Sequence, residues 1–289
     1  MAENMNFSFS GWVNQLHLAL DRSLMIRRHQ IPQFKSKIEI HSEKGNYIIK
    51  TISTYKELIL ALQLRYRVFV AKDQDTPFNG LDVDEFDAIC DHLAIIDKSK
   101  NKLVGTYRLN CSRFSDKFYS STEYDISPII QINANKLEIG RGCIHKDYRQ
   151  GAVISLLWRG VLEYLVASQS QIAFGCVSVK TTEVYDALLL YKHFREENYF
   201  SPDFFCSAID PFKIKGCDKL LEKWNQPLTE EEKNEAKELI PPLFRAYIYG
   251  GAKLCSPPII DAKFQTLDFL ISLKPSDMNP LHKKKYGFA

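Results

Sequence analysis

The stretch that decides the fold begins Lys136-Leu-Glu-Ile-Gly-Arg-Gly-Cys-Ile-His145, continues through residues 153–165, and ends with Ile172-Ala-Phe-Gly-Cys-Val-Ser-Val179. The first segment is typical of a β-strand, and its two glycines indicate a bulge or a close approach of another backbone. Apolar residues at helical spacing predict a helix over 153–165. The last segment is almost continuously apolar, as in a strand covered on both faces. The order of these segments is strand, helix, strand.

Further elements lie on both sides of this stretch. The patterns predict strands over 47–52, 92–97, 102–109 and 266–273, and helices over 55–69 and 183–193. We therefore expect an α/β protein with a mixed sheet. Its expected parts are an N-terminal helical arm (1–45), a core (46–200), and a C-terminal extension that packs on the core (201–289).

The composition of the 289 residues is that of an ordinary globular protein. The formal net charge is only +3, so we expect no nucleic acid among its partners. The seven cysteines are scattered and never spaced as Cys-x-x-Cys, which indicates reduced thiols and no metal site. The sequence has no apolar run of about 18 residues and no secretory signal, which predicts a cytoplasmic protein.

Residues 9–26 carry apolar side chains at three- and four-residue spacing, from Trp12 to Leu24, and are followed by the basic residues 27–29. This pattern predicts an amphipathic helix. One interpretation is a helix that packs on the protein's own core. The other is a helix that makes peripheral contact with the inner membrane.

The segment from Lys136 to Leu165 resembles the central strand and following helix of the GCN5-related N-acetyltransferase (GNAT) superfamily. Tyr191 falls where that superfamily often has an Ala-x-x-x-Tyr pattern. The resemblance implies splayed central parallel strands that hold a pantetheine arm. One segment differs, because Arg149-Gln-Gly-Ala-Val-Ile154 has a single glycine where the coenzyme A loop typically reads Gln/Arg-x-x-Gly-x-Gly/Ala. A weak pyrophosphate site suits acyl carrier protein as the donor, since its phosphopantetheine is attached through one phosphate.

Four shorter segments have the order and internal spacing seen in acyl-homoserine-lactone synthases: Arg65-Tyr-Arg-Val-Phe69, Asp84-Glu-Phe-Asp87, Gly105-Thr-Tyr-Arg108 and Glu138-Ile-Gly-Arg141. The sequence from about residue 58 to 270 is more similar to the ornithine Nα-acyltransferase family. That resemblance implies transfer of a (3-hydroxy)acyl chain from the phosphopantetheine thioester of acyl carrier protein to the α-amine of L-ornithine. This is the first step of ornithine-lipid biosynthesis, and it implies no permanently bound cofactor.

Glu138 is the candidate catalytic base. Attack on a thioester requires a neutral amine, whereas an α-amino group with a pKa of about 8 is mostly protonated at pH 7. The structural alternative is an ion pair of Glu138 with Arg141 or Arg108. Backbone N–H groups from Gly140 to Cys143 would stabilise the oxyanion, because the glycines allow the carbonyl to approach.

Five residues are candidate contacts of the substrates: Arg65, Phe69, Asp84, Asp87 and Arg108. Arg65 and Arg67 are two residues apart on a helix, so they should point in different directions. Asp84 and Asp87 are placed either to bind the acceptor's ammonium groups or to pair with arginines and fix a loop. Phe69 is expected in the wall of the acyl or pantetheine channel.

The remaining candidates concern the leaving thiolate and the donor. Tyr191 would protonate the thiolate, with helix packing as its alternative. Cys143 lies beside the proposed reaction site, and we interpret it as strand packing because no His-Asp pattern adjoins it. The expected contacts with acyl carrier protein and its pantetheine are Lys146, Arg149, Gln150 and Gly151.

Other functions remain open at this point. An N-acyl amino acid synthase would use glycine, lysine or another amine, and a non-catalytic acyl-carrier or lipid-binding module would bind without releasing thiol. His92 and Asp97 have the His-x4-Asp spacing of glycerolipid acyltransferases. Their separation within one apolar strand places them on opposite faces, which argues against that chemistry.

Overall fold

The computed structural model describes residues 24–28, 31–72, 80–149, 151–216, 224 and 226–286. Of the helix predicted over residues 9–26, only residues 24–26 lie within the described part, and they are helical. The contacts group the chain into two compact units, residues 1–108 with 141–160 and residues 109–140 with 161–289. The strand order is β1-β2-β3-β4-β6-β7-β11-β10, with β9 paired to β11, which confirms the predicted mixed sheet.

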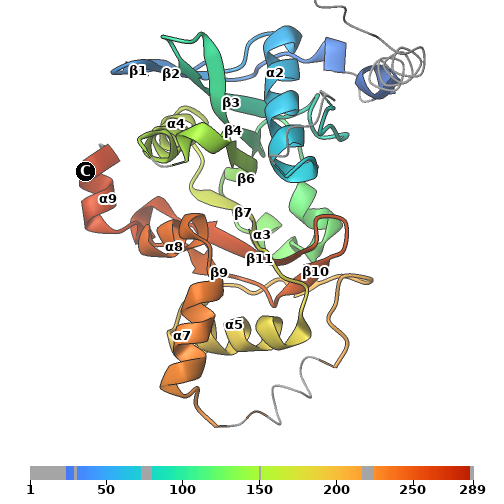
Figure 1. Cartoon of the computed structure of the whole chain (residues 1–289), viewed down its shortest axis with the longest axis vertical. Helices are drawn as coiled ribbons and strands as arrows, with labels where there is room; N and C mark the ends of the chain where they lie inside the picture. Colours follow the sequence, from blue (N-terminus) through green and yellow to red (C-terminus); the bar gives the residue numbers. More distant parts are fainter. Residues whose placement is uncertain are drawn as a thin grey trace, which may run out of the picture. The chain divides into compact units, whose positions relative to one another are not determined.

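The first unit is built from hairpins and one long helix. Strand β2 (Tyr47–Thr51) pairs with β1 (His41–Lys44) and β3 (Asp91–Asp97), and β4 (Lys102–Cys111) follows β3. Helix α2 (Tyr55–Arg65) packs its apolar side on β3 (Figure 1). It continues as a π-helix over Tyr66–Val70, a wider turn that is often found at functional sites. The other elements are η1 (Ile31–Gln33) and η4 (Lys146–Tyr148).

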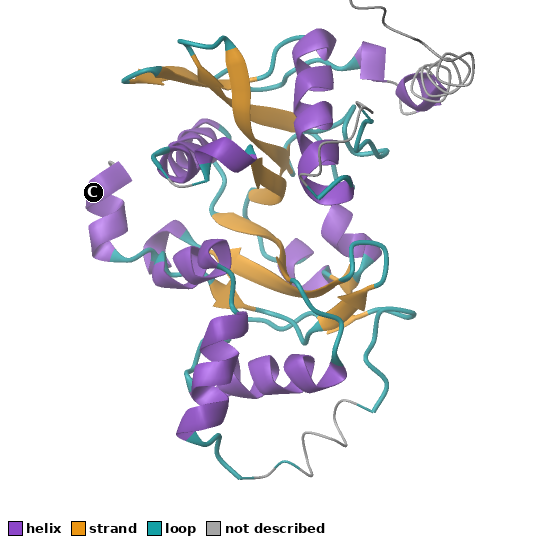
Figure 2. Ribbon diagram, viewed as in Figure 1, coloured by secondary structure: helices purple, strands orange, loops and turns teal. Residues whose placement is uncertain are grey.

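The second unit places helices around an antiparallel group of strands (Figure 2). Strand β11 (Thr266–Leu273) pairs over residues 267–273 with β7 (Ile172–Val179), and also with β10 (Ile259–Asp261) and β9 (Lys253–Leu254). A separate pair joins β5 (Tyr124–Asp125) to β8 (Ser207–Ala208). The remaining elements are η3 (Tyr119–Thr122), α3 (Ser127–Ile130), α5 (Val184–Glu196), α7 (Glu230–Leu239), α8 (Pro242–Tyr249), η5 (Pro275–Asp277) and α9 (Pro280–Tyr286).

Aromatic packing forms the core of the second unit. The rings of Phe194, on α5, and Phe269, on β11, meet edge to face with their centroids 5.4 Å apart. Phe244, on α8, contacts both rings and is fully buried. None of the helices in the described part of the chain has the length and apolar character that a membrane span requires.

The predicted parallel strands are β6 (Lys136–Ile144) and β7, connected by α4 (Val153–Ala167). Their ladder has three residue pairs, from Lys136–Ile172 to Glu138–Phe174, while both strands continue beyond it. A Cβ on Gly175 would overlap the carbonyl oxygen of Ile139, so the strands touch where the ladder ends. The splayed arrangement expected of the two strands is therefore confirmed.

Candidate active site

A buried network of arginines and aspartates occupies the first unit. Arg65, at the end of α2, is 1% exposed and donates from Nε to Asp82 at 2.8 Å and from Nη1 to Asp87 at 2.5 Å. Arg108, on β4, donates to Asp84 at 2.6 Å and to Asp87 at 3.2 Å. The loop with the three aspartates is thus attached to α2 and β4 by charge-assisted hydrogen bonds.

The arginines keep Asp84 and Asp87 ionised. Burial opposes the charged form of Asp87, but the neighbouring Arg65 and Arg108 hold its pKa well below the usual range. The ring Nε2 of His92 lies 2.9 Å from the backbone oxygen of Asp87, and burial lowers the pKa of His92 to about 4. Asp87 is fully buried, whereas the side chain of Asp84 is 20% exposed. Asp87 therefore fixes the loop, and Asp84 is the more accessible carboxylate.

Arg141 connects the network to the interrupted strand β6. Its Nη2 donates to Asp84 at 3.2 Å, and its Nε lies 3.6 Å from Asp82. Its φ of 50° is in the left-handed region, which is unusual for a residue with a side chain inside a strand. The sequence indicated an irregular backbone here, but the left-handed residue is the arginine and not a glycine. Such conformations persist where their surroundings hold them, and they cluster at functional sites.

The two glycines beside Arg141 have different surroundings. A Cβ on Gly140 would meet no atom within 4 Å, so its backbone is open to approach. A Cβ on Gly142 would overlap the ring of Tyr107, so only glycine fits. Cys143, the next residue of β6, is buried. The open backbone at Gly140 is where the expected oxyanion donors lie.

Glu138 is buried in β6, at the last pair of the ladder with β7. Its carboxylate accepts the backbone N–H groups of Tyr119 at 2.9 Å and Ser120 at 2.7 Å, and so holds the beginning of η3. The candidate base therefore lies at the point where the parallel strands separate.

Tyr191 is on α5, in contact with other aromatic and cationic groups. Its ring meets that of Phe200 edge to face at 5.2 Å, and the guanidinium of Arg195 lies 5.8 Å from its centroid. Together with Phe205 and Lys253 these residues line an open groove of the second unit. Its part in thiolate protonation stays a prediction.

The expected donor contacts lie around the start of α4. Lys146, in η4, and Arg149 are exposed, and Arg149 donates to the backbone oxygen of Ile144 at 3.2 Å. Gly151 is exposed, and Gln150 lies outside the described residues. Phe69 is half-buried in the π-helix and not in the α-helix that the periodicity predicted.

Arg67 and Arg65 have different partners, as their spacing predicted. Arg67 Nη1 lies 3.3 Å from Nε2 of the buried His145, which also lies 2.9 Å from Nζ of Lys102. Sequence reasoning did not single out this group. The signal available was the histidine at the end of the glycine-containing strand.

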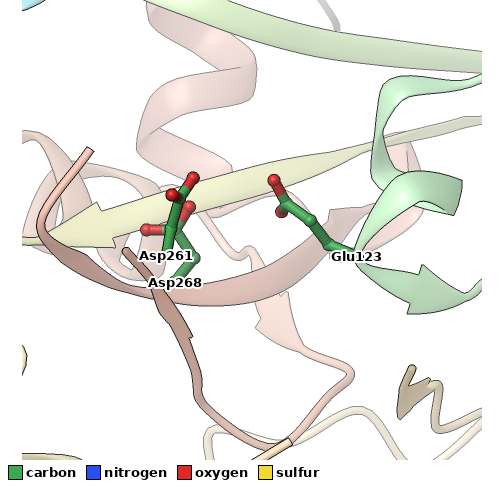
Figure 3. A group of neighbouring side chains, drawn as sticks. All are labelled: Glu123, Asp261 and Asp268. Atoms are coloured by element: carbon green, nitrogen blue, oxygen red, sulfur yellow. The ribbon is translucent and has the colours of Figure 1, made fainter. Parts of the chain in front are cut away.

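Three carboxylates that sequence reasoning missed gather in the second unit (Figure 3). Glu123 follows η3, Asp261 ends β10, and Asp268 lies in β11; one carboxylate oxygen from each lies within 4.8 Å of the others. The available signal was Asp268, an acidic residue within an otherwise apolar strand. Nothing in the sequence around Glu123 indicated that it joins them.

Comparison with known proteins identifies the family of this chain. Residues 64–159 match the acetyltransferase (GNAT) domain family. An L-ornithine N(alpha)-acyltransferase of Rhizobium meliloti is 30% identical over 246 residues, 80% of this chain and 81% of that protein. The protein of the same name from Rhodobacter capsulatus is 28% identical over 258 residues, 83% of this chain and 95% of that protein. A solved structure, FeeM, an N-acyl amino acid synthase from uncultured soil microbes, is 8% identical with a TM-score of 0.46, covering 83% of this chain and 99% of that chain. This chain is an acyltransferase and belongs to the L-ornithine N(alpha)-acyltransferase family.

Proposed function

We propose that the protein transfers a (3-hydroxy)acyl chain from acyl carrier protein to the α-amine of L-ornithine, as the first step of ornithine-lipid biosynthesis. The observation that carries the acceptor is the extent of the similarity. The L-ornithine N(alpha)-acyltransferase of Rhizobium meliloti matches over 80% of this chain, which includes parts of both units. The choice of acyl carrier protein as the donor is supported by the single glycine in residues 149–154, because such a segment makes a poor site for the pyrophosphate of coenzyme A.

The acceptor and donor are tested together. Purified protein is incubated with 3-hydroxyacyl carrier protein or with acyl-coenzyme A, each with ornithine, lysine or glycine, and the products are read by mass spectrometry. We expect Nα-acyl-ornithine, formed faster from the carrier protein. Acylation of glycine or lysine alone would refute ornithine, and binding of acyl carrier protein without thiol release would indicate a non-catalytic module.

In the proposed mechanism, Glu138 takes a proton from the acceptor's α-ammonium, either itself or through a water. The neutral nitrogen attacks the thioester carbonyl and, as the C–S bond breaks, releases its second proton to water. The thiolate leaves with a proton that we assign to Tyr191 as donor, and the tyrosinate is then reprotonated from solvent. Backbone N–H groups near the open Gly140 stabilise the oxyanion. Lys146 and Arg149, exposed and basic, are the proposed contacts of the acidic carrier protein.

Replacing Glu138 by glutamine should reduce kcat roughly 100- to 10,000-fold, the usual contribution of a general base. The amide keeps one oxygen acceptor for the N–H groups of η3, so the fold should survive with a loss of about 1–3 kcal/mol. Two measurements check this: kcat as a function of pH, and thermal unfolding. Glu231→Gln, on the exposed side of α7, is the control. A folded Glu138→Gln protein with near-normal kcat would remove Glu138 from catalysis.

A further inference from the structure

The acidic cluster of Glu123, Asp261 and Asp268 contains buried polar atoms that lack a partner in the structure. Asp268 Oδ1 and Thr266 Oγ1 have no hydrogen-bond partner of good geometry, although Thr266 and Ser178 lie close enough to Asp268 to lower its pKa. Asp268 and Thr266 are only 5% and 9% exposed. Burying a polar atom without a partner costs free energy, so such atoms call for an explanation in a native protein. Two of them at one site indicate a missing ligand.

The strand register directs these atoms toward the same place. Asp261 is paired with Thr266 across β10 and β11, and directly opposite residues share a face of the sheet. Asp268 is two residues from Thr266 on the same strand, so it lies on that face as well. Figure 3 shows the carboxylate of Glu123 pointing toward those of Asp261 and Asp268. The hydroxyl and the carboxylates therefore converge on one point.

The electrostatics at this point favour a bound cation. Burial raises the pKa of Asp268 to about 7, and the nearby Glu123 and Asp261 add to the shift. Cys176 donates from Sγ to Glu123 at 3.2 Å, and burial raises the pKa of this thiol well above its usual value, so it stays neutral. Carboxylates held this close repel one another until one of them takes up a proton or a positive group binds between them.

The cluster lies between solvent and an apolar wall. Ser178, opposite Asp268 on β7, is exposed, so this end of the face is open to water. On the same face the buried side chains of Ile259 and Leu270 belong to an apolar cluster that also includes Tyr124. A ligand with a cationic end and a hydrocarbon chain matches such surroundings.

We infer that Glu123, Asp261 and Asp268 bind the side-chain ammonium of the acceptor amino acid, with Thr266 as a further hydrogen-bond acceptor. This inference rests on the proposed function, which supplies an acceptor with two amines. An alkylammonium has three N–H donors, and the cluster has three carboxylates to receive them. Mg²⁺ and Ca²⁺ take six or more oxygens, whereas Oδ1 of Asp261 already accepts the N–H groups of Lys263 and Phe264.

This site accounts for acylation at the α-nitrogen. A side-chain ammonium has an ordinary pKa of about 10.4, and surrounding carboxylates raise it further, so that nitrogen stays protonated and cannot attack. The α-amine, with a pKa of about 8, is left to react.

The test compares ornithine with L-norvaline, which lacks only the side-chain amine. For Asp268→Asn and Glu123→Gln, we expect the ratio of kcat/KM for ornithine to that for norvaline to fall roughly 10- to 100-fold, the usual effect of losing a charged hydrogen bond. The readout is this ratio and not the absolute rate with either substrate. Glu231→Gln is the control, because it removes an exposed carboxylate of the same unit. Thermal unfolding shows whether each variant folds. If one of the two variants does not fold, the kcat/KM ratio of the other variant decides the test.

Each result has one meaning. If the wild type prefers ornithine and a folded variant keeps the full ratio, the inference is wrong and the proposed function stands. If the wild type acylates no ornithine from either donor, the proposed function fails. Calorimetric titration with Mg²⁺ or Ca²⁺ alone distinguishes a metal site. Metal binding that needs Asp268, together with loss of ornithine preference in a chelator, would overturn the ammonium assignment.

Discussion

Replacing Arg65 by methionine should lower the free energy of unfolding by about 3–5 kcal/mol, because it removes the guanidinium that donates to two buried carboxylates. Arg65 donates to Asp82 and Asp87, and Asp87 is fully buried. Methionine fills much of the same volume, so the loss reports mainly on charge. Urea unfolding at pH 7, analysed with the slope m, measures it.

A matched control is available two residues away. Arg67→Met removes a half-buried arginine from the π-helix but leaves the aspartates paired, so it should cost no more than about 1 kcal/mol. The double variant Arg65→Met with Asp87→Asn should recover part of the loss, since the unpaired charge is then removed. Equal losses for Arg65→Met and Arg67→Met would show that the network contributes little to stability.

The second large effect is a gain in stability. Asp268→Asn should raise the free energy of unfolding at pH 8 by about 2–4 kcal/mol, although it is expected to impair recognition of ornithine. The pKa of Asp268 is raised to about 7 by burial and by Glu123 and Asp261. Between about pH 4 and 7 the native state holds a proton that the unfolded state releases, so wild-type stability falls as pH rises through this window. Asparagine does not ionise, and its advantage should grow from pH 4 to 7.

Urea unfolding of both proteins at pH 4, 5, 7 and 8 measures this difference. The neighbouring Cys176 and Tyr124 do not contribute, because burial raises the pKa of each well above its usual value. Glu231→Gln should follow the wild type at every pH. Parallel stability curves for wild type and Asp268→Asn would contradict the raised pKa. A gain in stability together with a loss of selectivity is the trade-off typical of binding sites.

The main chain of the central elements could be predicted because its signals are local. Periodicity alone located β7, α4 and β11, since a buried strand and an amphipathic helix have different apolar spacing. Strand β1 was missed because its residues, His-Ser-Glu-Lys, have no apolar alternation and are held by pairing with β2. The π-helix after Arg65 was missed too, because helical spacing does not distinguish it from an α-helix.

The site was predictable in its residue types but not in its pairings. The sequence indicated that Arg65, Asp84 and Asp87 matter, yet several pairings of arginine with aspartate were compatible with it. Only the fold shows that Asp87 is buried between two arginines while Asp84 stays accessible. The acidic cluster was beyond prediction, because Glu123 is far in sequence from Asp261 and Asp268, and nothing local connects them.

Gly142 on β6 and Gly175 on β7 restrict engineering of this enzyme to different degrees. A side chain at residue 142 would overlap the ring of Tyr107, and a smaller side chain at residue 107 would remove that obstacle. At Gly175 the obstacle is the carbonyl oxygen of Ile139, and no substitution removes a main-chain atom. Libraries that seek new acyl or amine specificities can therefore vary residues 107 and 142 together, but they should keep glycine at 175.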